Sequence, residues 1–401
     1  MNEQTLTVSS RPYTRSWILL LALLTALAPL STDMYLPALP VMAQMYGTNT
    51  EMMSNSLPAY FIGLALGQLL YGPISDRFGR KKPLLFGLGL HILASLLCVY
   101  APSAMALLWI RVLQALGGCV GLVIARAAIR DCLPTAFAAQ AFASMMIVMG
   151  VAPIVAPMLG SWILAWFDWQ AIFWVLVLLG CVCWVWVWMG MEETLPADKR
   201  LPLTFGQALS TYKTVLSDAA FLWPMLAVCF SFSVLFSYII AAPAVLMGHF
   251  SLTQQQFAYV FGFNAIGTML LSACNHRLQQ HFSVLKRLQL GVWVQLLGTA
   301  LLLVASLSGG GLLWVMAGLF VSVAGIGLTA PNATALAMSQ QGKNAGSASA
   351  LIGSIQFGFG FLCGMVMAVL PWGSLVNMAC LMLAAVLCSA VAILKMSPLP
   401  D

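Results

Sequence analysis

Charged side chains are scarce in this sequence. Asp, Glu, Lys and Arg make up 7% of the 401 residues, whereas 61% are hydrophobic and the mean hydropathy is +0.95. A chain with so little polar surface cannot cover itself in water, so a soluble globular protein is excluded and lipid must be its solvent. Acidic residues are the rarest charged class, with none between Asp218 and the terminal Asp401. A carboxylate that works inside the membrane must therefore come from the N-terminal half.

Signatures of catalysis and metal binding are also missing. The sequence has no G-x-S-x-G nucleophile motif and no H-E-x-x-H motif, so it does not favour an intramembrane enzyme. Its ten cysteines fall within or at the ends of apolar runs, without a carboxylate or histidine that would complete a metal site. We expect no enzyme activity, no bound metal and no cofactor.

Long apolar runs separated by short polar breaks fill the chain. A helix needs about 20 apolar residues to cross a bilayer. The predicted spans are 17–39, 54–75, 83–101, 104–129, 138–164, 169–191, 219–247, 255–275, 285–307, 311–336, 345–369 and 374–395. The fold class is therefore an all-α polytopic membrane protein with twelve transmembrane helices.

The basic residues predict the orientation. Sixteen of the 17 Lys and Arg residues lie in or beside alternate loops and the two termini, and the other loops carry none. By the positive-inside rule both termini are cytoplasmic. Because these charges are spread over many short loops, they do not indicate a nucleic-acid-binding patch.

The longest polar connection divides the chain. It predicts an N-terminal six-helix bundle at 1–191, a cytoplasmic linker at 192–218 and a C-terminal six-helix bundle at 219–401. Two such bundles are typical of transporters that work by alternating access. Since each bundle finds its partner within the chain, we expect a monomer.

The most specific motif follows the second span, from Gly72 to Lys82. It resembles the G-x-L-A-D-R-x-G-R-[KR] loop of the major facilitator superfamily, which implies a conformational latch between the bundles. The latch positions are Gly72, Asp76, Arg77, Gly79, Arg80 and Lys81. The alternative is that these charges only enforce topology.

Two charged residues lie deep in the apolar spans, Asp33 and Arg111. The segment from Leu107 to Gly118 resembles the span-4 pattern L-x-x-x-R-x-x-Q-G-x-G of the same superfamily, with Ala115 in place of a glycine. Both charges lie roughly 10 Å inside the external ends of their spans. A membrane-buried arginine needs a partner, so we expect Asp33 to carry the proton and Arg111 to sense its charge. A static ion pair is the alternative.

Small residues and two prolines mark the fifth span. Gly150, Pro153, Pro157 and Gly160 fall in a segment that resembles the exchanger motif of the superfamily, although Ala156 and Ser161 replace glycines. Such a helix can bend and pack closely, as a gating helix must. The alternative is ordinary small-residue packing, which implies no direction of transport.

Four further segments narrow the resemblance. Residues 31–40, 67–73, 169–174 and 192–196 are similar to the Bcr/CflA, bicyclomycin-resistance type of drug:proton antiporter. The resemblance implies a proton-coupled multidrug efflux antiporter of the bacterial inner membrane that exports small amphipathic compounds, bicyclomycin- or amphenicol-like, by alternating access. The alternatives are a proton-coupled importer or exporter of a small metabolite such as a nucleoside, and a receptor that does not transport.

Polar and aromatic residues of the spans are candidates for binding a small-molecule substrate. They are Tyr35, Tyr60, Gln68, Phe236, Tyr238, Asn264, Asn332 and Gln356. Each could instead form a hydrogen bond between helices. Arg126, near the cytoplasmic end of the fourth span, either snorkels to the interface or lines the inner vestibule.

Overall fold

The computed structural model describes residues 15–200 and 205–396 of the chain. Over these residues the structure is helical and holds no β-strand, and twelve helical segments are long and apolar enough to cross a membrane. The predicted fold class is therefore confirmed. The two termini, whose side of the membrane the sequence predicts, lie outside the described residues.

The first six spans use nine helical elements. These are α1 (Arg15–Asp33), η1 (Leu36–Ala38), α2 (Leu39–Met45), α3 (Thr50–Ser54), α4 (Ser56–Phe78), α5 (Lys81–Val99), α6 (Ala104–Cys132), α7 (Thr135–Trp166) and α8 (Gln170–Gly190). The connection that follows contains η2 (Ala197–Lys199) and α9 (Phe205–Leu216). The last six spans are formed by α10 (Ala219–Ala242), η3 (Pro243–His249), α11 (Gln254–Leu278), α12 (Val284–Leu307), α13 (Leu312–Ala324), α14 (Ile326–Met338), η4 (Gly342–Asn344), α15 (Ala345–Val369) and α16 (Ser374–Leu394).

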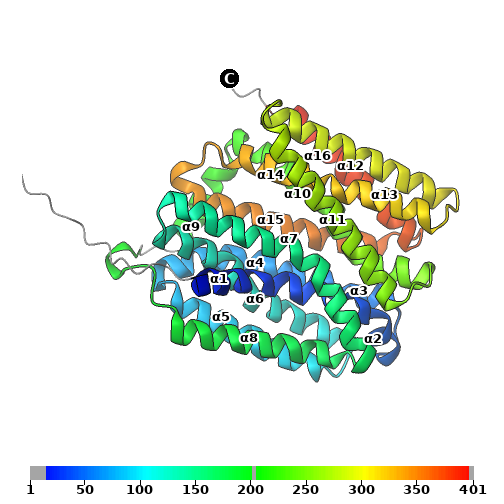
Figure 1. Cartoon of the computed structure of the whole chain (residues 1–401), viewed down its shortest axis with the longest axis horizontal. Helices are drawn as coiled ribbons and strands as arrows, with labels where there is room; N and C mark the ends of the chain where they lie inside the picture. The colour runs from blue at the N-terminus through cyan, green and yellow to red at the C-terminus, as the bar shows by residue number, and fades with distance from the viewer. Residues whose placement is uncertain (1–14, 201–204, 397–401) are drawn as a thin grey trace, which may run out of the picture.

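The helices run side by side along the long axis of the molecule (Figure 1). Figure 1 places α1, α4, α5, α6 and α8 in its lower part and α10, α12, α13, α14 and α16 in its upper part. The two groups meet mainly where α4 packs on α15 and where α7 packs on α11. The bundle boundaries at 191/192 and 218/219 stay a prediction.

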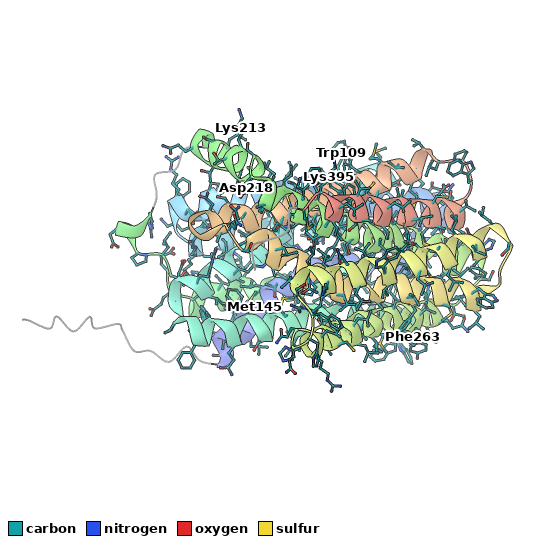
Figure 2. The ribbon with its side chains drawn as sticks, turned by 90° about the horizontal axis from the view of Figure 1, so that it is seen from above. Trp109, Met145, Lys213, Asp218, Phe263 and Lys395 are labelled. Carbon is teal, nitrogen blue, oxygen red and sulfur yellow. The ribbon has the colours of Figure 1, made fainter. Side chains whose placement is uncertain are left out.

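Because the helices run along one axis, their connections lie at two opposite ends of the molecule. We call the end that holds the turn at 79–80, the turn at 133–134 and residues 191–218 the linker end, and the opposite end the far end. Large apolar side chains such as Trp109 and Phe263 point outward and are 68% and 48% exposed (Figure 2). This outer surface suits lipid rather than water.

The first span is broken where the acidic residue lies. Helix α1 ends at Asp33, and η1 and α2 restart the chain with Pro37 and Pro40 in their first turns. Proline is accepted at these positions because the first N–H groups of a helix have no partner within it. The break leaves the last carbonyls of α1 free to accept hydrogen bonds from elsewhere.

Candidate functional site

Asp33 is the last residue of α1 and is only 4% exposed. Its carboxylate neighbours the Thr32 hydroxyl and lies within electrostatic reach of the Tyr238 hydroxyl on α10. In the described part of the chain, no Lys, Arg or His nitrogen approaches it within 4.0 Å. Asp33 is therefore a buried acid without a cationic partner, just before η1, which packs on α11 of the C-terminal half.

Arg111, on α6, is completely buried. Its Nη1 donates to Gln114 Oε1 at 2.6 Å, and its Nη2 donates to the Ser31 carbonyl at 2.8 Å. The guanidinium lies 4.4 Å from the ring centroid of Tyr35 and 4.2 Å from that of Tyr60. The positive charge thus stabilises one of the open carbonyls at the end of α1 and is enclosed by two aromatic faces.

Among the residues that the structure describes, Asp33 and Arg111 form no ion pair, and their expected roles in proton coupling stay a prediction. The two residues sit at the same end of α1, but Arg111 binds the backbone of the helix that carries Asp33 rather than its carboxylate. The reason is the break in the first span, which presents unpaired carbonyls to the arginine. Arg111 is therefore a positioning residue for the end of α1.

Six of the expected substrate residues lie in or near the core of the molecule. Tyr35 and Tyr60 enclose Arg111, and the Tyr35 hydroxyl also bonds to Ser56. Tyr238 accepts a hydrogen bond from Asn264 Nδ2 at 3.0 Å. Tyr35, Tyr60, Gln68, Phe236, Tyr238 and Asn264 are all at most 4% exposed.

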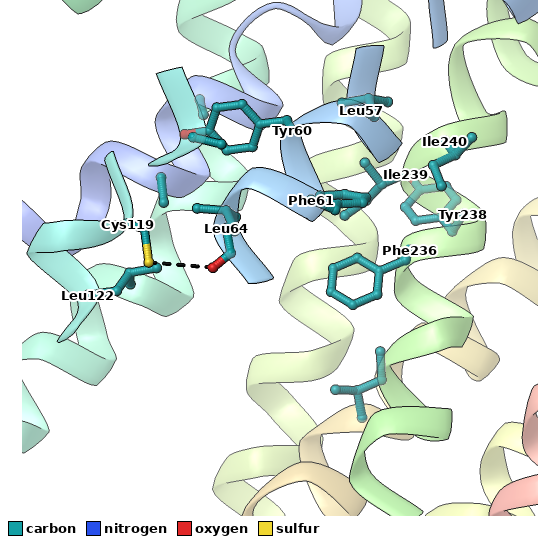
Figure 3. Packing of buried hydrophobic residues seen from close by; sticks show 14 of the residues in the cluster. Leu57, Tyr60, Phe61, Leu64, Cys119, Leu122, Phe236, Tyr238, Ile239 and Ile240 are labelled. Atoms are coloured by element: carbon teal, nitrogen blue, oxygen red, sulfur yellow. Dashed lines mark hydrogen bonds between the residues drawn. The ribbon is translucent and has the colours of Figure 1, made fainter. Parts of the chain in front are cut away.

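The contact between the two halves, formed mainly by α4 on α15 and α7 on α11, is called the seam. An aromatic cluster closes it. The ring centroid of Phe61 lies 4.7 Å from that of Phe236 (Figure 3). The ring centroid of Phe357 lies 5.6 Å from that of Phe236. Gln68 packs against Gly353 of α15 on the same seam. Gln356, another expected substrate residue, is half-buried on α15. The phenylalanines Phe61 and Phe357 carry no polar signal and were not among the expected residues.

Asn332 belongs to a different cluster. Its Nδ2 donates to Asn275 Oδ1 at 2.8 Å, and the same oxygen accepts from Arg287 Nη1 at 3.1 Å. These three residues lie at the linker end of α11, α12 and α14. Asn332 is thus tied into a structural network away from Asp33.

The turn at 79–80 is organised by Arg80, which is 6% exposed. Its Nη1 donates to Asp76 Oδ1 at 2.6 Å and to Ser75 Oγ at 2.7 Å, and its Nε donates to Asp131 Oδ2 at 2.8 Å. The Glu193 carboxylate accepts from the Arg80 N–H at 2.7 Å. This network joins α4, α6 and the segment after α8.

The other expected latch residues make fewer contacts in this turn than Arg80 does. Gly79 has φ +86°, where a side chain would be strained and would strike the Glu193 carboxylate. Lys81 donates to the Trp188 carbonyl at 2.9 Å, whereas Arg77 is exposed beside the Phe78 ring. Gly72 lies beside the linker helix α9, near the Tyr212 hydroxyl.

The expected latch between the bundles stays a prediction. The hydrogen-bond partners found for Arg80 and Lys81 lie between Ser75 and Glu193, in the N-terminal half and the start of the linker. Asp131 and Glu193 were not among the expected site residues. The sequence could have indicated both residues, because acidic residues are scarce and few carboxylates are available to neutralise this basic loop.

The linker helix also reaches into this region. Pro73 has no N–H, so the Leu69 carbonyl lacks its usual donor within α4. The Tyr212 hydroxyl of α9 donates to that carbonyl at 3.2 Å. A helix that the polar composition of the linker did not predict thus completes the hydrogen bonding of α4.

The expected gating helix is the continuous α7. A β-carbon on Gly160 would collide with the Met34 carbonyl, directly after Asp33, so α7 and the end of α1 pack backbone to backbone. Gly150 faces Met269 of α11, in the other half. Pro153 and Pro157 lie between these contacts. Helix α7 therefore touches both the Asp33 region and the C-terminal half.

The site lies in a protein of twelve spans, with a buried acid at a break in the first span and a buried arginine in the fourth. The sequence of this protein is similar to those of known proteins. The family model described as Major Facilitator Superfamily matches residues 21–364. The chain belongs to the Major Facilitator Superfamily. The bicyclomycin resistance protein homolog of Haemophilus influenzae is 30% identical, over 94% of each chain. This similarity agrees with the Bcr/CflA type to which the motifs of the sequence point.

Other similarities support the same superfamily. The uncharacterized MFS-type transporter YdgK of Bacillus subtilis is 34% identical, over 84% of each chain. The crystal structure of a D-xylose-proton symporter matches with a TM-score of 0.70 at 14% identity, covering 93% of this chain and 96% of that one. At this identity the structural match shows the fold alone. As a member of the superfamily, the protein is a multi-pass membrane transporter.

Proposed function

We propose that the protein is a proton-coupled multidrug efflux antiporter that exports small amphipathic compounds. The observation that carries this proposal is Asp33, buried without a cation at the end of α1, just before η1 packs on α11 of the other half. An ionised carboxylate buried without a partner costs several kcal/mol. Closing the seam over an empty site therefore needs a proton on Asp33, whereas an ionised Asp33 favours the open seam until substrate occupies the site.

This coupling yields an exchange cycle. When the seam is open to the outside, a proton neutralises Asp33, substrate leaves and the two halves rock inward. When it is open to the cytoplasm, Asp33 loses the proton and substrate binds. Arg111 keeps the end of α1 in place during the cycle through the Ser31 carbonyl. Helix α7 transmits the movement, because it packs on Met34 and on α11.

The distribution of basic residues supports an orientation in a bacterial inner membrane. The far-end turns at 46–49, 100–103, 167–169 and 308–311 contain no Lys or Arg, whereas the linker end carries Arg77, Arg80, Lys81 and Lys82. By the positive-inside rule the linker end and both termini face the cytoplasm. The protein acts as a monomer, because its seam is formed within one chain.

The aromatic cluster and the related proteins support the substrate class. Phe61, Phe236 and Phe357 offer apolar surface at the seam, and Tyr238 and Asn264 add polar groups, as suits a moderately apolar ligand. The relative from Haemophilus influenzae is named for bicyclomycin resistance. Bicyclomycin- and amphenicol-like compounds are therefore the first to test.

Uptake into everted vesicles tests the direction of transport. In these vesicles respiration acidifies the lumen, so an antiporter that exports drugs from cells should accumulate radiolabelled chloramphenicol or bicyclomycin, and an uncoupler should abolish the uptake. A proton-coupled importer gives a different result. If the vesicles take up neither drug while intact cells accumulate a labelled nucleoside, the efflux proposal is wrong.

A further inference from the structure

Arg126 is an exposed cation in a buried stretch of α6. From 117 to 129 the residues of this helix are buried except for Val123, which is half-buried, and Arg126, which is exposed. Arg126 lies six residues before the end of α6 at Cys132, or roughly 9 Å inside that end at 1.5 Å per residue. A charge at this depth in a membrane span indicates a function.

The face of α6 that carries Arg126 points toward the seam rather than toward lipid. Two turns earlier on this face, Cys119 donates to the Leu64 carbonyl of α4 at 3.5 Å (Figure 3). One turn later, Arg130 Nη2 lies 3.9 Å from the position that a β-carbon would take on Gly346, at the start of α15. Helices α4 and α15 form the contact between the two halves. Arg126 is therefore exposed to a solvent-accessible space inside the linker end.

No carboxylate neutralises this arginine in the described part of the chain. Asp76 and Asp131 are held by Arg80, and Asp218 accepts from Gln341 at 2.9 Å. No ion pair involves Arg126 there. The charge nearest to it along this face is Arg130, one turn away, and like charges at this spacing repel. The positive end of the α15 dipole beside Arg130 adds to the same field.

We propose that Arg126 and Arg130 bind an acidic group of the transported molecule as it enters from the linker end. The substrates then include, beside neutral compounds, small amphipathic acids or zwitterions whose carboxylate or phosphonate meets the two guanidinium groups. Arginine suits this task because its planar fork can donate two parallel hydrogen bonds to such a group. The inference deepens the proposed function and rests on it for the cytoplasmic placement of the linker end.

Paired probes that differ by one acidic group test this assignment. Binding to the purified full-length protein in phosphatidylcholine nanodiscs is measured for chloramphenicol and its succinate ester, and for phenylbutyramide and phenylbutyrate. We expect at least one acid to bind about tenfold tighter than its neutral partner, the size expected of a charged hydrogen bond. Arg126→Gln should remove that preference and Arg126→Lys should restore part of it.

A control variant and a lipid arm complete the test. Arg277→Gln removes the same charge from an exposed position at the linker end of α11 and should leave the preference unchanged. If no acid binds better than its neutral partner, or if Arg126→Gln keeps the preference, the assignment is wrong. It is also wrong if phosphatidylglycerol in the nanodiscs displaces the acid, because the arginines would then hold lipid phosphate.

This test is independent of proton coupling. Because it measures binding without a pH gradient, its result does not depend on whether Asp33 carries a proton. Loss of antiport with a retained acid preference would overturn the proposed function and leave the anion site in place.

Discussion

Replacing Arg80 by glutamine should destabilise the N-terminal half of the protein. The change removes the charged hydrogen bonds to Asp76 and Asp131 and the bond to Ser75. The Asp76 and Asp131 side chains are 35% and 19% exposed, so solvent screens part of each interaction. We expect the free energy of unfolding to fall by about 2 to 4 kcal/mol, and the Tm by roughly 5 °C or more.

Thermal unfolding of the detergent-purified protein measures this effect. Arg77→Gln is the matched control, since Arg77 is exposed beside Phe78 and stands outside the network. A change of Tm below about 1 °C in Arg80→Gln, or an equal change in the control, would refute the reasoning.

The same comparison has a predicted pH dependence. Burial disfavours the charged guanidinium of Arg80, but its hydrogen bonds and charge interactions with Asp131 and Asp76 outweigh burial, so its pKa lies above the ordinary arginine value. A raised pKa means that the stabilisation is fully present below the unfolded pKa and is lost only as pH rises through the folded one. Arg80 should therefore stay cationic between pH 6 and pH 9 and add no pH dependence of its own to the difference between wild type and Arg80→Gln. Titration of Arg80 within that range would contradict this account.

Three further substitutions follow from single contacts. Tyr212→Phe removes the hydrogen bond to the α4 carbonyl freed by Pro73, and should lower the Tm by a few degrees, equivalent to about 1 kcal/mol; no change would show that the bond contributes nothing. Gly160→Ala forces a methyl group onto the Met34 carbonyl and should cost about 1 to 3 kcal/mol in an unfolding measurement, whereas Gly358→Ala, which enters open space, should be silent. Arg111→Lys cannot keep both side-chain hydrogen bonds in a planar fork, so drug uptake by vesicles should fall at least tenfold; wild-type uptake would exclude a positioning role.

Much of the fold could be predicted because lipid imposes a simple rule on the sequence. Each span must be apolar over its whole length, so hydropathy locates the twelve spans to within a few residues of their observed bounds. The break after Asp33 was not predicted, because the predicted span at 17–39 is continuous, although Pro37 and Pro40 suit the first turn of a new helix.

The partners within the site were harder to predict. Depth along a span follows from sequence position, which put Asp33 and Arg111 at similar levels, but the direction in which each side chain points depends on tertiary packing. The backbone carbonyl of Ser31, which binds Arg111, is invisible in a pattern of side chains. The aromatic cluster was missed for a similar reason, since Phe61 and Phe357 read as ordinary apolar residues until the two halves meet.

Proton movement in energised everted vesicles tests the central claim about Asp33 most directly. A fluorescent dye reports the acidic lumen, and chloramphenicol or bicyclomycin is then added to vesicles that contain wild type, Asp33→Asn or the control Asp168→Asn, which changes an exposed acid at the far end. We expect the drug to dissipate the pH gradient in wild type and the control but not in Asp33→Asn. Drug-dependent dissipation at the wild-type rate in Asp33→Asn would show that Asp33 is not the proton carrier.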